Sequence, residues 1–256
     1  IINKGKKSKL FNEIEIEKIS RFTSGFKEFD RVLGGGIVPG SIVLVGGEPG
    51  IGKSTIVLQA AGKISLNEKV LYVTAEESLE QVKIRWERLN QKSIDLKIYA
   101  ETNLSLIIEE IKRVNPSFAI IDSIQAINND EMESSPGSVS QVRTCSSELH
   151  NLAKENNIAL LIIGHVTKDG ALAGPKTLEH LVDVVLNFEG DNIASHRILR
   201  SVKNRFGATF EIGIFEMLEN GLLEISNPSS IYTSKENISG VTTTITNEGT
   251  RPFAVD

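Results

Sequence analysis

The sequence predicts an α/β fold, in which a mostly parallel β-sheet is covered by helices on both faces and carries an antiparallel β-meander at one edge. Two observations predict it. Up to about residue 165, short apolar runs alternate with amphipathic helical segments, as expected for a parallel sheet. From residue 182 onward, short strands follow one another with turns between them, a pattern typical of antiparallel neighbours.

The individual elements follow from apolar spacing and from residues that start or stop helices. Gly34-Gly35-Gly36 ends the first helix, Ser78 can cap a later one, and Pro116 stops another. The polar segment 128–138 has the composition of an exposed loop. We expect strands over 41–46, 69–74, 96–99, 118–122 and 158–163, helices over 26–33, 55–61, 79–89, 104–111 and 142–153, and meander strands over 182–188, 196–202, 210–217 and 222–225.

Composition limits the possible functions. The 256 residues are 40% hydrophobic, which indicates a globular chain, and the net charge of −5 means that nucleic-acid binding would need local basic patches. Cys145 is the single cysteine, so an internal disulfide and a multi-cysteine zinc site are excluded within this chain, and a reducing cytoplasm fits. We find neither an 18-residue apolar run nor a signal peptide, and the absence of an initial Met suggests a fragment.

Residues 47–54, directly after the first expected strand, match the GxxxxGK[ST] phosphate-binding loop. A strand that ends in a Gly-rich turn and opens a helix aims backbone N–H groups and the positive end of the helix dipole at one point. Lys53 would reach the β- and γ-phosphates, and Ser54 would be a ligand of Mg²⁺. The residues predicted to bind ATP are Gly47, Glu48, Pro49, Gly50, Ile51, Gly52, Lys53, Ser54 and Thr55.

Four more short segments end strands, and we expect them at the same edge of the sheet as this loop, because ligands of open α/β sheets collect at the carboxyl ends of strands. Asp122 is placed to hold the waters of a bound Mg²⁺, although an acid at a strand end is common. Glu76 could polarise the attacking water or simply start a helix. His165 is either a sensor of the γ-phosphate or structural, and Lys203 with Arg205 is either a solvated rim or a cationic finger toward a neighbouring subunit. Cys145 and Trp86 are better explained by packing.

Taken together, these segments resemble the bacterial RadA (Sms) branch of the RecA-like ATPases, from about Arg21 to Arg251. Lys-Asn-Arg-Phe-Gly at 203–207 marks this branch, whereas the other motifs are shared with RecA, replicative helicases and KaiC-like clock ATPases. The motifs are Gly47 to Ser54, Tyr72-Val73-Thr74-Ala75-Glu76-Glu77-Ser78, Ile120-Ile121-Asp122-Ser123, Gly164-His165-Val166-Thr167-Lys168, Ala173-Gly174-Pro175-Lys176 and Lys203-Asn204-Arg205-Phe206-Gly207.

The resemblance implies a RecA-like core that uses ATP and Mg²⁺, forms a homo-hexameric ring, binds single-stranded DNA and promotes branch migration of recombination intermediates, with a recombinase as a possible partner. Lys203 and Arg205 match family positions at the subunit interface, where Lys203 would act in trans. Loops 128–138 and 166–175 would face the central channel, where Arg143, Lys168 and Lys176 could meet phosphates.

The resemblance also implies a domain order. We expect a basic linker over residues 1–20, the RecA-like ATPase domain over 21–226, and a linker over 227–256 toward a C-terminal Lon-protease-like domain. Family members carry a four-cysteine zinc module at the N-terminus, and one cysteine means that this piece holds no such zinc.

Two other classes remain open. A KaiC-like signalling ATPase that acts through protein partners without DNA suits Thr23-Ser24-Gly25-Phe26 and the Glu76-Glu77 pair equally well, and the segment 203–207 argues against it. Stimulation by single-stranded DNA would discriminate between the two. A small-molecule kinase would need a substrate pocket and a lid, and we find no candidate lid insertion.

Overall fold

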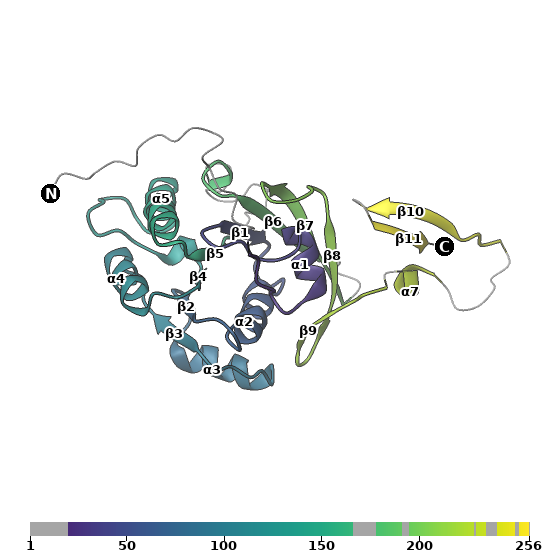
Figure 1. Ribbon diagram of the computed structural model, residues 1–256, viewed down its shortest axis with the longest axis horizontal. Coiled ribbons are helices and arrows are strands. Elements are labelled where there is room, and N and C mark those ends of the chain that lie inside the picture. Colours follow the sequence, from purple (N-terminus) through teal and green to yellow (C-terminus); the bar gives the residue numbers. More distant parts are fainter. Residues whose placement is uncertain are drawn as a thin grey trace.

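The computed structural model describes residues 20–165, 178–190, 195–227, 229–233, 240–248 and 251–255. Within this part of the chain, nine strands form one sheet in the order β3-β2-β4-β5-β1-β6-β7-β8-β9 (Figure 1). The predicted fold class is confirmed, because a parallel core continues into antiparallel strands at one edge.

Six neighbouring strands form the parallel part of the sheet. Four of them have no exposed residue, as expected for strands that are covered on both faces. Their predicted positions are confirmed to within one or two residues. The strands are β1 (Ile42–Gly47), β2 (Val70–Thr74), β3 (Leu96–Ala100), β4 (Phe118–Asp122), β5 (Ala159–Ile163) and β6 (Val184–Gly190).

Strand β6 joins the two parts of the sheet. It pairs in parallel with β1 and antiparallel with β7 (His196–Asn204), so the first strand of the predicted meander is also the last parallel strand. Strands β8 (Ile212–Leu218) and β9 (Gly221–Glu224) complete the antiparallel edge. Because β7 runs opposite to β6, its first residue lies at the carboxyl edge of the parallel strands and its last at their amino edge.

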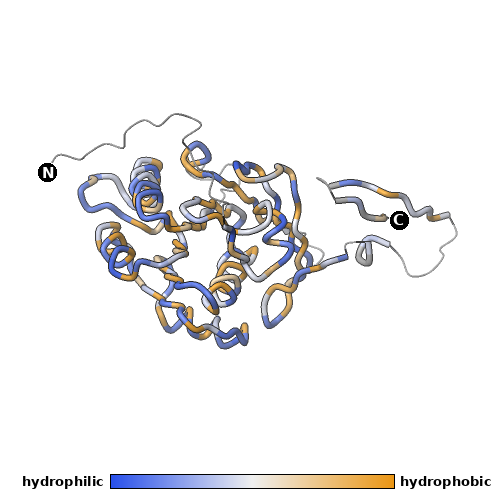
Figure 2. The backbone as a smooth tube through the Cα atoms, in the orientation of Figure 1, coloured by the Kyte–Doolittle hydropathy of each residue, from blue (hydrophilic) through white to orange (hydrophobic). Residues whose placement is uncertain are grey.

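Helices cover both faces of the sheet and bury two apolar layers (Figures 1 and 2). On one face lie α1 (Lys27–Leu33), α2 (Lys53–Ile64) and α3 (Leu79–Arg88). On the other face lie α4 (Leu104–Val114) and α5 (Val139–Asn156), and a short 3₁₀ helix, η2 (Ile124–Ala126), follows β4. Burial of these apolar layers, at roughly 25 cal/mol per Å², holds the sheet and helices together.

The helix ends follow the predicted signals. Ser78 caps α3 with a complete capping box, in which its side chain accepts a hydrogen bond from the N–H of Gln81 while the Gln81 side chain accepts one from the N–H of Ser78. Gly34 ends α1 in the left-handed conformation, which glycine adopts without strain. Asn115 takes the same conformation directly before Pro116.

The C-terminal segment contains more regular structure than its Ser/Thr-rich composition indicates. Within the predicted linker lie a short helix, α7 (Ser229–Tyr232), and a hairpin of β10 (Thr244–Glu248) and β11 (Arg251–Val255), drawn beside the sheet in Figure 1. β-Branched residues favour such strands. Residues 1–19 lie outside the described residues, and the domain boundaries stay predictions. None of the described helices combines the length and the hydropathy that crossing a membrane requires.

Candidate functional site

The phosphate-binding motif forms a strand, loop and helix at the carboxyl edge of the parallel strands. β1 ends at Gly47, and α2 begins at Lys53 with Gly52 as its N-cap. Gly47, Gly50 and Gly52 all have positive φ angles, of 154°, 77° and 113°, so the turn needs glycine. Apart from Gly50 and its two chain neighbours, no described residue has an atom within 4 Å of the place that a Cβ of Gly50 would occupy, so the loop leaves space beside its backbone.

Lys53 is buried in this loop and donates hydrogen bonds to its backbone. Its Nζ lies 2.8 Å from the carbonyl oxygen of Gly47 and 2.9 Å from that of Glu48. Burial lowers the pKa of Lys53, and the charges of Asp122 and Glu76 oppose that effect by favouring the ammonium. One cation from the start of α2 and two carboxylates, from the end of β4 and the residues after β2, therefore gather near one point.

Asp122 lies at the end of β4, level with Thr74 on β2. It is 7% exposed, and its Oδ2 accepts a hydrogen bond from the hydroxyl of the fully buried Tyr72. Burial raises the pKa of Tyr72, and the neighbouring Asp122 charge raises it further, so the phenol stays protonated and donates. The carboxylate of Asp122 is thus oriented by a partner from the adjacent strand.

Glu76 follows β2 and is held by two side chains. Its Oε1 accepts a hydrogen bond from the Ser123 hydroxyl and lies 3.0 Å from Nε2 of His165. The hydrogen bond with His165 lowers the pKa of Glu76 most, burial opposes it, and the Ser123 hydrogen bond lowers it again. At neutral pH the group is therefore a carboxylate.

The neighbouring Glu77 faces a different partner. It forms an ion pair with Arg85 on α3, and its backbone hydrogen-bonds with the Thr74 side chain. Of the two adjacent acids, only Glu76 thus contacts the residues that gather at Lys53.

Lys203 and Arg205 do not join this group, and the expectation that they share its edge is wrong. β7 ends at Asn204 opposite Val184, which is the first residue of β6. Because β7 is antiparallel, both cations lie at the amino edge of the parallel strands, which is the edge opposite the phosphate-binding loop. Lys203 Nζ donates to the carbonyl oxygens of Glu179, at 2.5 Å, and Val182, at 2.8 Å.

The same strand direction brings an unpredicted residue to the site. Arg197, near the start of β7, donates from Nε to the carbonyl oxygen of Ile51 in the loop, at 3.2 Å. Gly190 allows this approach, because a Cβ there would lie 2.2 Å from Cδ1 of Ile51. Ser123 and Tyr72 are the other site residues whose roles the motifs did not indicate, although both lie within the motifs that carry the family resemblance.

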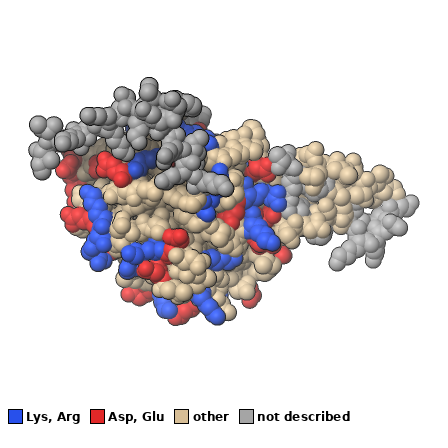
Figure 3. All heavy atoms as spheres, in the orientation of Figure 1, with Lys and Arg blue, Asp and Glu red and all other residues tan. Residues whose placement is uncertain are grey.

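The predicted DNA contacts are only partly described. Arg143 lies near the start of α5 and is exposed, beside Val139, Ser140 and Thr144 in an open depression. Lys168 and Lys176 lie outside the described residues. In the view of Figure 3, basic and acidic side chains are interspersed, so that face carries no continuous basic stripe.

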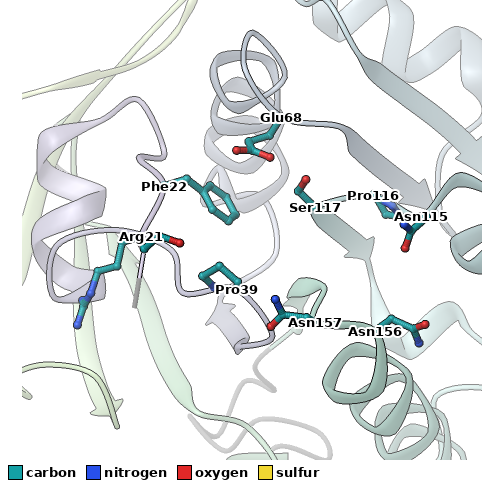
Figure 4. A pocket seen from close by; sticks show the side chains of 10 residues that line it. Arg21, Phe22, Pro39, Glu68, Asn115, Pro116, Ser117, Asn156 and Asn157 are labelled. Carbon is teal, nitrogen blue, oxygen red and sulfur yellow. The ribbon is translucent and has the colours of Figure 1, made fainter. Parts of the chain in front are cut away.

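A separate hollow of about 370 Å³ lies at the amino edge of the sheet (Figure 4). Its walls are the residues that precede several parallel strands, among them Pro39, Glu68, Ser117 and Asn157, together with Phe22. None of the predicted site residues that the structure describes lines it, so it is distinct from the phosphate-binding loop.

The sheet order, the loop and the acids beside Lys53 define a RecA-like P-loop ATPase core. A family model described as "ATPase: KaiC" matches residues 22–109. The solved KaiC-like protein PH0186 of Pyrococcus horikoshii superposes with a TM-score of 0.65 over 81% of this chain and 99% of its own, at 20% identity, which supports the fold alone.

Curated relatives narrow the class. The DNA repair protein RadA of Listeria monocytogenes is 52% identical over 95% of this chain and 54% of its own length. RadA of Streptococcus pneumoniae is 51% identical over 98% of this chain and 61% of its own length. Within the RecA-like ATPases the chain is thus a relative of the RadA proteins, as the motifs predicted, and it spans between half and two thirds of the length of the curated relatives it matches.

Proposed function

We propose that this chain is the ATPase core of a DNA-repair protein that binds ATP with Mg²⁺ and couples its hydrolysis to single-stranded DNA and branched recombination intermediates. The observation that carries the proposal is the convergence of Lys53, Asp122 and Glu76 at the carboxyl edge of the sheet. The identity of about one half with proteins named RadA supports the link to DNA repair.

The residues present fit a magnesium nucleotide. The open loop beside Gly50 and the N-terminus of α2 offer N–H donors to phosphates, and Lys53 adds a positive charge. Of the two carboxylate oxygens of Asp122, Oδ2 accepts from Tyr72, and no described residue hydrogen-bonds to Oδ1. Oδ1 is therefore available to a water on a cation that Ser54 would also hold. When bound, Mg²⁺ would neutralise charge on the phosphates.

Glu76 is the base in this proposal. Its carboxylate accepts the proton of a water whose oxygen attacks the γ-phosphorus, while the bond from that phosphorus to the oxygen of ADP breaks. Ser123 and His165 both contact Oε1, and these two contacts fix the orientation of the Glu76 carboxylate. His165 would report loss of the γ-phosphate to the residues that follow it.

The position of Lys203 and Arg205 supports a role between subunits. They lie at the amino edge of the sheet, remote from the phosphate-binding loop of their own chain, so they can reach a nucleotide only in another copy. A head-to-tail interface closes into a ring when successive rotations complete a full turn, and a homo-hexamer is the assembly we propose. Cations supplied in trans stabilise the charge of phosphoryl transfer.

In this proposal single-stranded DNA contacts Arg143 and the residues Lys168 and Lys176. Contacts of this type release counterions, so binding should weaken steeply with salt. A recombinase is the protein partner that fits branch migration. A KaiC-like signalling ATPase is the second candidate, favoured by the family model that matches residues 22–109.

Steady-state ATP hydrolysis with and without single-stranded DNA, at two salt concentrations and with Lys53→Ala as the blank, tests the proposal. We expect stimulation by DNA that falls as salt rises, and no turnover in Lys53→Ala. Turnover that ignores DNA would favour the signalling alternative. Full activity of Lys53→Ala would refute the assignment of the loop.

A further inference from the structure

Asp183 is a buried carboxylate that precedes β6 at the amino edge of the sheet, and no motif contains it. Asp183 is 2% exposed, and its side chain contacts three separate elements. Oδ2 accepts hydrogen bonds from the N–H of Ile42 at 3.0 Å and from Nζ of Lys154 at 2.7 Å. Oδ1 accepts one from Nη1 of Arg205 at 3.0 Å.

These contacts keep the buried group ionised. Burial alone would raise the pKa of Asp183, but the hydrogen bonds from Lys154, Ile42 and Arg205 outweigh it and lower the pKa. A buried charge persists only when partners compensate its lost hydration, and here two cations do so. Asp183 therefore draws the end of α5, the start of β1 and the segment after β7 to one point.

Asp183 and the residues just before it hold both proposed interface cations. The N–H of Arg205 donates to the carbonyl oxygen of Asp183 at 3.1 Å, so this residue binds Arg205 through backbone and side chain. Lys203 donates to the carbonyl oxygen of Val182, which is next to Asp183 in the chain, and to that of Glu179, four residues before Asp183. The directions of both cations thus depend on residues 179–183.

The other contacts of the segment fix its backbone but not its charges. Asn204 donates to the carbonyl oxygen of Val32 at 3.2 Å, and Arg21 donates to that of Phe206 at 2.8 Å. Gly207 packs against Gly34, since a Cβ on Gly207 would lie 2.8 Å from the Cα of Gly34. Among the described carboxylates, Asp183 alone forms an ion pair with Arg205.

We infer that Asp183 is a positioning residue, which holds Lys203 and Arg205 in the orientation that completes the nucleotide site of an adjacent copy. The inference rests on the proposed function, because it assumes that these cations act in trans. A purely structural role would instead affect the subunit that carries the substitution.

Asp183→Asn tests this inference, because it keeps the shape and removes the charge. The side chains of Lys154 and Arg205 are 40% and 55% exposed, so both can turn to water and the chain can fold. We expect ATP affinity to stay unchanged and turnover to fall about tenfold to a hundredfold, as misplacement of about 1 Å can cost about 10²-fold. Asp95→Asn removes the carboxylate of an exposed ion pair with Lys97 and controls for the loss of one negative charge alone.

Mixing two variant proteins distinguishes a positioning role of Asp183 from a purely structural role. Lys53→Ala has a dead site but intact interface cations, so it should supply them to a neighbouring Asp183→Asn subunit. An equal mixture of the two should exceed the mean of its parents and approach about one quarter of the wild-type rate, the share of productive interfaces when head-to-tail subunits mix at random. No gain on mixing, or wild-type turnover of Asp183→Asn alone, would overturn the inference.

A parallel mixture of Lys53→Ala with Lys203→Ala identifies which idea has failed. If that mixture gains activity and the Asp183→Asn mixture does not, the positioning role alone is wrong. If neither gains, the cations do not act in trans, and the proposed interface is wrong as well.

Discussion

Replacement of Glu76 by Gln should separate ATP binding from ATP hydrolysis. The amide keeps an oxygen that can accept from Ser123 and His165, so the side chain can hold its orientation. It cannot take a proton from water. General-base catalysis contributes about 10²–10⁴-fold, so kcat should fall by that factor, equal to about 3–5 kcal/mol of transition-state stabilisation.

The pH profile provides a second measurement of the same site. Because the contacts with His165 and Ser123 lower the pKa of Glu76, the acid limb of kcat/KM should lie below the ordinary pKa of a glutamate. Ser123→Ala removes one hydrogen bond to the carboxylate, so it should raise that pKa and move the acid limb to higher pH. Its loss of rate should be smaller than that of Glu76→Gln.

Single-turnover hydrolysis together with equilibrium nucleotide binding provides the assay. Glu77→Gln is the matched control, because Glu77 pairs with Arg85 and not with the site. It should keep kcat within about twofold of wild type, because the Glu77 side chain pairs with Arg85 on α3 and does not contact the groups that would touch the nucleotide. A Glu76→Gln protein that hydrolyses ATP at the wild-type rate, or a Glu77→Gln protein that is equally slow, would refute the assignment of the base.

Three further predictions concern stability. Ile120→Ala, at the fully buried centre of β4, should lower the free energy of unfolding by about 2–5 kcal/mol in urea titrations, whereas the exposed Leu106→Ala should change it far less, and equal effects would contradict the two-layer core. Gly207→Ala should cost about 1–3 kcal/mol by the same measurement, because its Cβ would press on the Cα of Gly34, and an unchanged midpoint would rule out that close contact. The pKa of Asp183 is lowered in the folded state, so its contribution to the free energy of unfolding is present above the pKa of an unfolded aspartate and is lost as pH falls through the folded pKa. Asp183→Asn should therefore lose less stability on acidification than wild type. Parallel curves of unfolding free energy against pH would argue against this ion cluster.

Patterns within short stretches predicted most of the fold. The strand at 118–122 and the helix capped by Ser78 stand where apolar runs and the capping signal placed them. The hairpin of β10 and β11 was missed, because its Ser/Thr-rich surroundings have the composition of a linker, and only the pairing of two strands reveals it.

The candidate site divides in the same way. The phosphate-binding loop lies within a few consecutive residues, so its motif is sufficient to find it. Asp122, Glu76 and His165 gather near Lys53 because parallel strands all end at one edge, a rule that needs no knowledge of strand order.

The sequence by itself determined the loop, the parallel core and the acids at its carboxyl edge. Only the tertiary structure decided that Lys203 and Arg205 lie at the opposite edge, that Arg197 reaches the loop, and that Asp183 joins three elements. The physical reason is that the spacing of apolar residues in a strand is the same whether the strand runs parallel or antiparallel to its neighbours. Strand direction depends on the neighbour with which a strand pairs, and that pairing joins residues far apart in the chain.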